Sequence, residues 1–237
     1  MKTILLLKVP FYLLTLMIFL GCDATEIESQ TPINTNSHLI ADVEGNVYKT
    51  VKIGSQIWMA ENLRTTKFND GHSIPCTTDN TSWSNLRTSG YCWSNNDTLN
   101  KDIYGGLYNW YAVNSGKLAP IGWHVPSDAE WEILCTYLGG QEVAGGKLKE
   151  IGTEHWIDPN TGATNETGFG ARGTGVRNSD GTFAFFREMA KYWTSTPGGW
   201  HPETDAYYRG ICTFETILGR SSHQKIDGHS VRCVKDE

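Results

Sequence analysis

The order of local patterns along this chain limits its fold more than any other feature. The clearest helix signal lies in the middle, at residues 127–139, where Ser127 and Glu130 have the S-x-x-E spacing of a capping box. A glycine pair ends this stretch. Apolar residues recur at i, i+3, i+4 and i+7, which predicts one buried helix stripe made of Trp131, Leu134, Cys135 and Leu138.

Strand patterns lie on both sides of this helix. Residues 47–53 alternate between apolar and polar, and Gly54-Ser55 separates them from a second run at 56–60, as in a β-hairpin. Short helices are expected at 104–113 and 141–150. Further strands are expected at 176–177, 182–185, 192–195, 206–214, 216–218 and 229–234. Because strands and helices are segregated along the chain, we predict an α+β fold with antiparallel pairing.

Composition narrows the class of protein. Hydrophobic residues make up 39%, aromatic residues 11% and charged residues 19%, which excludes a disordered chain and a coiled coil. The net charge of −6 is the opposite of the basic excess that displaces counterions from nucleic acid. We therefore expect a globular domain with no nucleic-acid partner.

Residues Met1–Gly21 have the pattern of an export signal, because two lysines precede an apolar run at 9–20. This run is shorter than a typical membrane span. It ends at Leu20-Gly21-Cys22, which resembles a bacterial lipoprotein signal, in which the cysteine becomes the lipidated first residue of the mature chain. The alternatives are an ordinary secretory signal with an incidental cysteine and an uncleaved anchor.

The stretch 22–41 is rich in Thr, Ser, Asn and Gln, and we expect it to be a flexible linker ahead of a domain at 42–237. The acidic residues Asp23, Glu26 and Glu28 resemble the surface-export signal of Bacteroidetes-type lipoproteins, and a plain solvated tether is the alternative. We therefore expect an exported outer-membrane lipoprotein, facing the periplasm or the cell surface, whose lipid anchor makes the membrane a partner.

Five cysteines remain if Cys22 carries lipid, and disulfides persist in an exported protein. Cys76 and Cys92 share one long polar loop and are the first expected pair. By the chain-entropy estimate, closing that loop would stabilise the fold by roughly 3 kcal/mol. Cys135 and Cys233 lie in apolar stretches, where each fits a buried thiol as well as a disulfide partner, and Cys212 has no clear partner.

The chain has no motif with a complete catalytic or metal-binding pattern. The glycine-rich stretch 168–173 has dinucleotide-loop spacing, but a strand pattern follows where a helix is needed. The histidines include no H-E-x-x-H and no i, i+4 pair, and the cysteines include no C-x-x-C, so no metal site is expected. Residues 158–162 are expected to form a turn, with a structural calcium ion as the alternative, and no other cofactor is expected.

Several stretches together carry a family resemblance. They are GNVYKTVKIG at 45–54, QIWMAENLR at 56–64, YGGLYNW at 104–110, GWHVPSDAEW at 122–131, YWTST at 192–196 and SVRCV at 230–234. In this order they resemble the Fibrobacter succinogenes major paralogous domain, a family of bacterial surface-type lipoproteins. The resemblance covers nearly all of the chain beyond the linker.

That family is grouped with C-type lectin-like folds. The resemblance implies a bent, looped antiparallel sheet with one or two main helices, long loops and neighbouring termini. It also implies a Cys135–Cys233 disulfide, because lectin-like domains often join the first helix to the last strand. The sugar-binding motifs Glu-Pro-Asn and Trp-Asn-Asp are absent, and the catalytic cysteine pair of the related formylglycine-generating enzymes has no match.

We expect a surface-anchored binding module for a glycan or protein ligand, without catalysis. The expected site lies on the loops between 193 and 210, where aromatic rings stand beside polar groups that can orient a ligand. Its residues are Trp193, Trp200, His201, Asp205, Tyr207, Tyr208 and Arg209. The alternatives are a structural component of the envelope or of a fibre, and an enzyme of the formylglycine-generating or hydrolytic type.

Lipidation predicts a clear phase behaviour. Replacing Cys22 by Ser is expected to move the protein from the detergent phase to the aqueous phase, because the anchor is lost. Cys76→Ser is the matched control and should stay in the detergent phase. If the Cys22 variant partitions like the unchanged protein, the lipid anchor is not on this residue.

Overall fold

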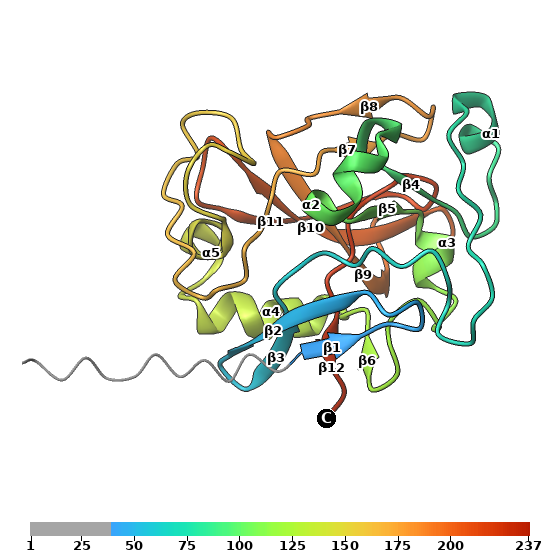
Figure 1. Cartoon of the computed structure of the whole chain (residues 1–237). Helices are drawn as coiled ribbons and strands as arrows, with labels where there is room; N and C mark the ends of the chain where they lie inside the picture. Colours follow the sequence, from blue (N-terminus) through green and yellow to red (C-terminus); the bar gives the residue numbers. More distant parts are fainter. Residues whose placement is uncertain (1–38) are drawn as a thin grey trace, which may run out of the picture. The chain divides into compact units, whose positions relative to one another are not determined.

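The computed structural model describes residues 39–237 (Figure 1). The predicted signal, the lipidated Cys22 and the linker up to residue 38 lie outside this range. The linker prediction is wrong at its end, because Leu39–Ala41 forms strand β1 and pairs with β2 (Val47–Ile53). No helix within residues 39–237 is long and apolar enough to cross a membrane.

A five-stranded antiparallel sheet joins the two ends of the described chain. Its strand order is β1-β2-β3-β12-β6. The further members are β3 (Gln56–Met59), β6 (Trp123–His124) and β12 (Val234–Lys235). The predicted hairpin is confirmed by β2 and β3, and Gly54 at its turn has a φ of 61°. The first and last strands share one sheet, as the resemblance implied.

A second antiparallel sheet has the order β11-β10-β9. Its strands are β9 (Met189–Pro197), β10 (Asp205–Cys212) and β11 (Leu218–Gln224). Two small hairpin-like pairs complete the set: β4 (Tyr91–Trp93) with β5 (Gly106–Tyr108), and β7 (Val176–Arg177) with β8 (Phe183–Ala184). The strands predicted at 176–177, 182–185, 192–195 and 206–214 are confirmed within a few residues.

The predicted strand at 229–234 is mostly not part of a ladder. Gly228, His229 and Ser230 form single bridges to three different strands, at Arg177, Tyr108 and Tyr192. This segment therefore joins β7, β5 and β9, and only its end enters β12. The strand predicted at 216–218 begins instead at Leu218 and runs on to Gln224.

The two central helices follow the sequence prediction. They are α4 (Asp128–Tyr137), which packs on β9 and β10, and α5 (Gln141–Leu148), which packs on β10 and β11. The capping box is present, since Ser127 Oγ accepts from the Glu130 N–H at 3.2 Å and the Glu130 carboxylate accepts from the Ser127 N–H at 2.7 Å. The shorter helices are α1 (Asn80–Ser84), α2 (Lys101–Tyr104), α3 (Trp110–Val113) and the 3₁₀ turns Ser94–Asn96 and Thr98–Asn100.

The predicted helix at 104–113 is wrong. The chain leaves the helical conformation at Gly105, whose φ is 74°. A Cβ atom at this position would lie 2.6 Å from the Cβ of Asn62, so only glycine fits the close approach. Residues 106–108 then pair with β4, and helix resumes only at α3.

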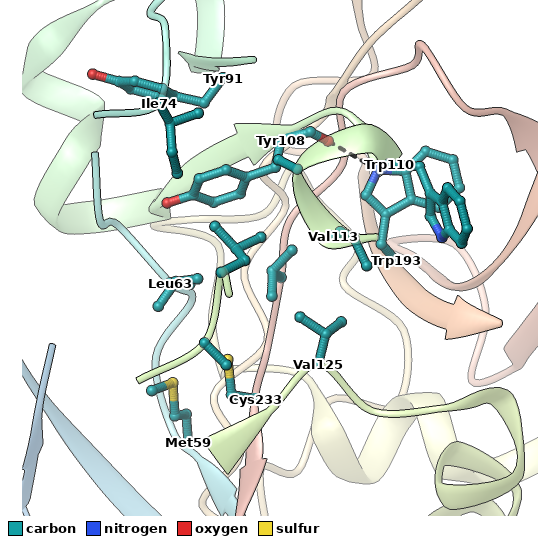
Figure 2. Packing of buried hydrophobic residues seen from close by; sticks show 14 of the residues in the cluster. Met59, Leu63, Ile74, Tyr91, Tyr108, Trp110, Val113, Val125, Trp193 and Cys233 are labelled. Carbon is teal, nitrogen blue, oxygen red and sulfur yellow. Dashed lines mark hydrogen bonds between the residues drawn. The ribbon is translucent and has the colours of Figure 1, made fainter. Parts of the chain in front are cut away.

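The buried side chains form two large clusters and one small one. The first lies around β5, α3 and the C-terminal segment and includes Tyr108, Trp110 and Trp193 (Figure 2). The second surrounds the buried stripe of α4, which is confirmed: Trp131, Leu134, Cys135 and Leu138 are each at most 4% exposed. Strand alternation explains the division, because successive residues such as Trp58 and Met59 face different clusters.

Arg232 lies between these clusters and is 1% exposed. Its guanidinium donates to Asn62 Oδ1 at 2.6 and 3.0 Å and to the carbonyl oxygens of Met59 and Phe169 at 3.2 and 2.5 Å. The Asn62 amide in turn donates to the Tyr104 carbonyl at 2.8 Å. One buried cation therefore connects the hairpin, the chain around Gly105 and the C-terminal segment.

The α+β class is confirmed, with antiparallel sheets and few helices. The finer expectation of a C-type lectin-like fold stays a prediction from the resemblance.

The helix cap gives a stability prediction. Ser127→Ala is expected to lower the free energy of unfolding by about 1 kcal/mol, because one N-terminal amide of α4 loses its acceptor. Ser55→Ala, at an exposed turn position, is the control and should change it by less than about 0.5 kcal/mol. Urea unfolding measures both. Equal midpoints for the two variants would contradict the role of the cap.

Candidate functional site

The residues predicted to bind a ligand do not form one surface. Trp200 is 95% exposed and His201 is exposed beside it, as expected for the loop between β9 and β10. Trp193 is fully buried, and its indole N–H donates to the Tyr108 carbonyl at 2.8 Å (Figure 2). The prediction that Trp193 binds ligand is therefore wrong, because its ring belongs to the core.

The prediction that Arg209 binds ligand is also wrong, because this residue is only 1% exposed. Its guanidinium donates to Asp128 Oδ1 at 3.0 Å and to Glu132 Oε2 at 3.1 Å, so it fixes α4 to β10. Tyr208, the neighbouring residue, points to the opposite side and packs against the first core cluster. Strand alternation thus separates residues that are adjacent in sequence.

Tyr207 and Asp205 are half-buried at the end of β10. The Arg220 guanidinium lies 3.8 Å from the centre of the Tyr207 ring. A hydrogen bond to Arg220 lowers the pKa of the Tyr207 hydroxyl. Of the predicted set, Trp200 and His201 are the freely exposed members, and Tyr207 joins the surface described next through Arg220.

An open groove of about 910 Å³ runs along the outer face of α4. Its lining is mostly apolar and comes from α4, the end of β9 and one residue of β11. The residues are Asp128, Ala129, Glu132, Ile133, Thr136, Tyr137, Thr196 and Arg220. Ile133 and Tyr137 are 52% and 65% exposed, although both are large and apolar in body. They are spaced i, i+4 outside the buried stripe, a signal that was readable in the sequence.

The polar rim of this groove is held by ion pairs. Asp128 Oδ2 accepts from Arg220 at 2.7 Å, while Asp128 Oδ1 accepts from the buried Arg209. Thr196 Oγ1 accepts from the Asp128 N–H at 3.0 Å. These contacts give the groove a fixed shape, and they occupy most of the polar atoms on its rim.

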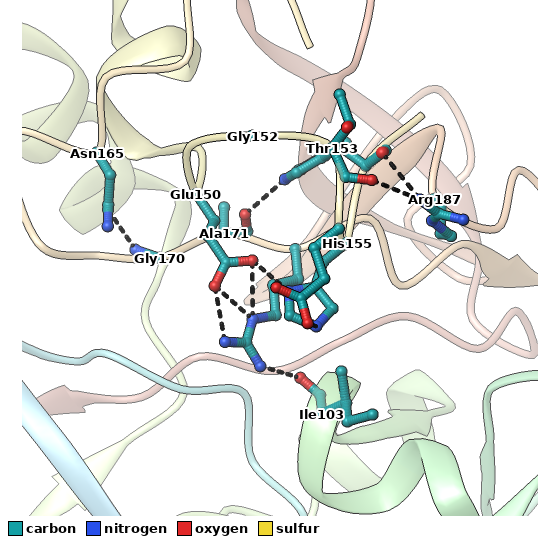
Figure 3. A network of polar contacts seen from close by, with 12 residues as sticks. Ile103, Glu150, Gly152, Thr153, His155, Asn165, Gly170, Ala171 and Arg187 are labelled. Atoms are coloured by element: carbon teal, nitrogen blue, oxygen red, sulfur yellow. Dashed lines mark hydrogen bonds and ion pairs between the residues drawn. The ribbon is translucent and has the colours of Figure 1, made fainter. Parts of the chain in front are cut away.

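A second hollow of about 180 Å³ is polar and lies at the end of the β2–β3 hairpin. Several of the charged groups around it are paired with one another. Arg172 makes a bidentate contact with the Glu150 carboxylate, with a shortest distance of 2.7 Å, and donates to the Ile103 carbonyl at 2.9 Å (Figure 3). The same carboxylate lies 2.5 Å from His155 Nδ1. This network connects loops and occupies the charges of Arg172 and Glu150.

The structure has no disulfide between any of the cysteines in residues 39–237, so neither expected pair is present. The backbone of Cys76 forms a single β-bridge with that of Tyr91. Cys92 follows Tyr91 in β4, so its side chain points to the other side of that strand. Cys135 and Cys233 belong to different core clusters. Burial raises the pKa of the Cys92 thiol to about 12 and also raises the pKa values of Cys135 and Cys233, as expected for unreactive buried thiols.

Arginine holds the long loop for which a disulfide was expected. Arg177 is fully buried and donates to the carbonyl oxygens of Thr77 and Thr78, the latter at 2.8 Å. Its guanidinium also lies 4.4 Å from the Trp83 ring centre. The loop is therefore connected to β7 by hydrogen bonds.

Residues 158–162, for which a calcium ion was the alternative to a turn, contact the buried Lys149. Lys149 is fully buried, and its ammonium donates to the carbonyls of Thr161, Cys212 and Glu215 at 2.7, 3.1 and 2.9 Å. Burial lowers the pKa of Lys149 to about 8. The Thr161 carbonyl of this stretch therefore accepts from a lysine.

Three residues with metal-binding side chains meet at the end of β11. They are His223, Asp227 and His229, each of which has a ligand atom within 4.8 Å of the others. Their spacing, H-x₃-D-x-H, is neither H-E-x-x-H nor a histidine pair at i, i+4, so those motifs do not reveal it. No other cluster of this kind occurs within residues 39–237.

Comparison with known proteins identifies the family of this chain. No curated protein and no solved structure matches the chain. Residues 51–235 match the Fibrobacter succinogenes major domain, which covers nearly all of the described chain. The protein is therefore a member of the Fibrobacter succinogenes major domain family.

Proposed function

We propose that this domain is a non-catalytic binding module at the bacterial envelope and that it binds a protein ligand in the groove on α4. Lipid on Cys22 would hold it at the outer membrane, at the periplasmic or the outer face. The observation that carries the proposal is the preformed apolar groove with Ile133 and Tyr137 exposed in it. Exposed apolar surface of this kind, with a polar rim, is typical of interaction sites.

The groove is organised before any ligand arrives. The Tyr137 ring packs against the β2–β3 turn, where a Cβ atom on Gly54 would lie 2.9 Å from it. On the other side, the buried Arg209 fixes the Asp128 and Glu132 carboxylates. A rigid aromatic beside a fixed rim lowers the entropy that binding must overcome.

The chemistry of the groove favours a protein over a sugar. A sugar needs several hydrogen-bonding groups around one aromatic face, whereas the polar atoms on the rim are bound to one another. An aliphatic or aromatic side chain of a partner needs apolar area, which Ala129, Ile133 and Tyr137 supply. The same pairing of carboxylates with arginines argues against their use as a catalytic acid and base.

Glycan binding at Trp200 is the second candidate. Its support is the 95% exposure of this ring, beside the exposed His201 and the half-buried Asp205. This site lies on the loop between β9 and β10, and Trp200 does not line the α4 groove. Variants can therefore separate the two sites.

Photo-crosslinking tests the groove. A photoreactive phenylalanine analogue at Ile133 of the full chain, in native membranes, is expected to give one discrete protein adduct. The additional change Tyr137→Asp should reduce its yield about tenfold or more, because a charge enters the apolar contact. The analogue at Ile121, which is 82% exposed and does not line the groove, is the control and should give no such adduct.

Equal labelling from positions 133 and 121 would contradict the proposal. An adduct between two copies of the chain would favour a structural envelope component. Binding to a glycan array that Trp200→Ala abolishes and Tyr137→Asp leaves intact would move the function to the second candidate.

A further inference from the structure

The cluster at the end of β11 is a buried polar site that the proposed function does not use. Asp227 and His229 are 6% and 0% exposed, and the His223 side chain is 35% exposed. His223 Nδ1 lies 2.7 Å from Asp227 Oδ2. The ring centres of His223 and His229 are 5.5 Å apart.

His229 carries the argument, because one of its ring nitrogens has no hydrogen-bond partner. Its Nδ1 lies 2.9 Å from the Gly228 carbonyl, which can only accept, so Nδ1 carries the proton. Its Nε2 therefore presents a lone pair, and this atom is buried without a donor among residues 39–237. A buried acceptor without a donor is unfavourable and often marks an unseen ion or water.

Contacts within the protein explain the positions of His223 and Asp227 but not the unpaired Nε2 of His229. Lys191 is 5% exposed, and its ammonium lies 3.4 Å from His223 Nε2. Hydrogen bonds thus join Lys191 to His223 and His223 to Asp227, and a metal ion bound by His223 would replace one of them. These hydrogen bonds do not reach His229 Nε2, so a further ligand is needed to explain this atom.

We propose that His223, Asp227 and His229 bind a divalent transition-metal ion of the Zn²⁺ type. Two imidazoles and one carboxylate are a ligand set that Zn²⁺ and its neighbours accept, whereas Ca²⁺ prefers oxygen alone. The partly exposed His223 lies on the solvent side, which leaves access for the ion and for a water as fourth ligand. Because His229 Nδ1 donates to the Gly228 carbonyl, Nε2 is the ring nitrogen that is left to bind metal.

The surroundings fit a shielded site with one opposing charge. The Trp193 and Tyr208 rings lie 4.2 and 5.3 Å from His229 and exclude water on that side. The Lys191 ammonium, 3.4 Å from His223 Nε2, opposes the ion electrostatically. Replacing it by Met, which keeps the length without the charge, is therefore expected to tighten metal binding.

This site is independent of the groove. Lys191 and Tyr208 project from the side of the β9–β11 sheet that meets His229, whereas Arg209 and Arg220 project from the side that meets α4. A failure of either proposal leaves the other untouched.

Metal titration of the purified full-length protein, without an affinity tag and after chelation and dialysis, tests the site. Zn²⁺ alone is expected to bind at one equivalent by calorimetry, and Co²⁺ should give visible absorption typical of nitrogen and oxygen ligands. His223→Gln and Asp227→Asn should each weaken binding at least about tenfold. His201→Gln, an exposed histidine outside the cluster, is the control and should bind like the unchanged protein.

Because His229 is fully buried, its variants can fail to fold, so the partly exposed His223 decides the test. Circular dichroism establishes that each variant is folded. No binding of either ion at one equivalent would overturn the proposal. Binding that is the same in the folded His223 and Asp227 variants would also overturn it, because the ion would then lie elsewhere.

Discussion

A buried arginine without a carboxylate partner is the contact on which much of this fold depends. Arg232 donates to Asn62 and to two backbone carbonyls, and no carboxylate in residues 39–237 lies within ion-pair distance of it. Its guanidinium also lies 4.2 Å from the Phe169 ring centre. Burying a cation is favourable only when its donors are satisfied, so the positions of Met59, Asn62 and Phe169 are fixed together.

Buried cations also hold other parts of the fold together, where short strands and long loops do not form strand ladders. Arg177 holds the loop before β4, Arg209 holds α4 to the second sheet, and Lys149 gathers three carbonyl oxygens. Each buried cation donates to carbonyl or carboxylate oxygens of segments that no strand ladder joins to it. This explains how a loop-rich domain closes without the disulfides that the cysteines suggested.

Local patterns were enough to predict the β2–β3 hairpin, both central helices and the buried stripe of α4, because capping, periodicity and turn residues act over short distances. The break at Gly105 depends on its approach to Asn62, and the burial of Trp193 and Arg209 depends on which face of β9 and β10 meets which partner. Such long-range contacts leave no local signal. The groove could be predicted in part, because Ile133 and Tyr137 lie outside the buried stripe of α4. The only sequence signal for the cluster of His223, Asp227 and His229 is that the three residues are close in sequence.

The stability of an Arg232→Met variant tests the central claim most directly. Methionine keeps much of the volume but removes every donor, which leaves Asn62 Oδ1 and two carbonyls buried without partners. We predict a loss of several kcal/mol in the free energy of unfolding, at roughly 1–3 kcal/mol for each such group. Arg64→Met is the control, because this guanidinium donates to the Val47 carbonyl at the surface and pairs with the exposed Asp102 at 3.6 Å; it should lose about 1 kcal/mol or less. An Arg232 variant within about 1 kcal/mol of the unchanged protein in urea unfolding would contradict the account.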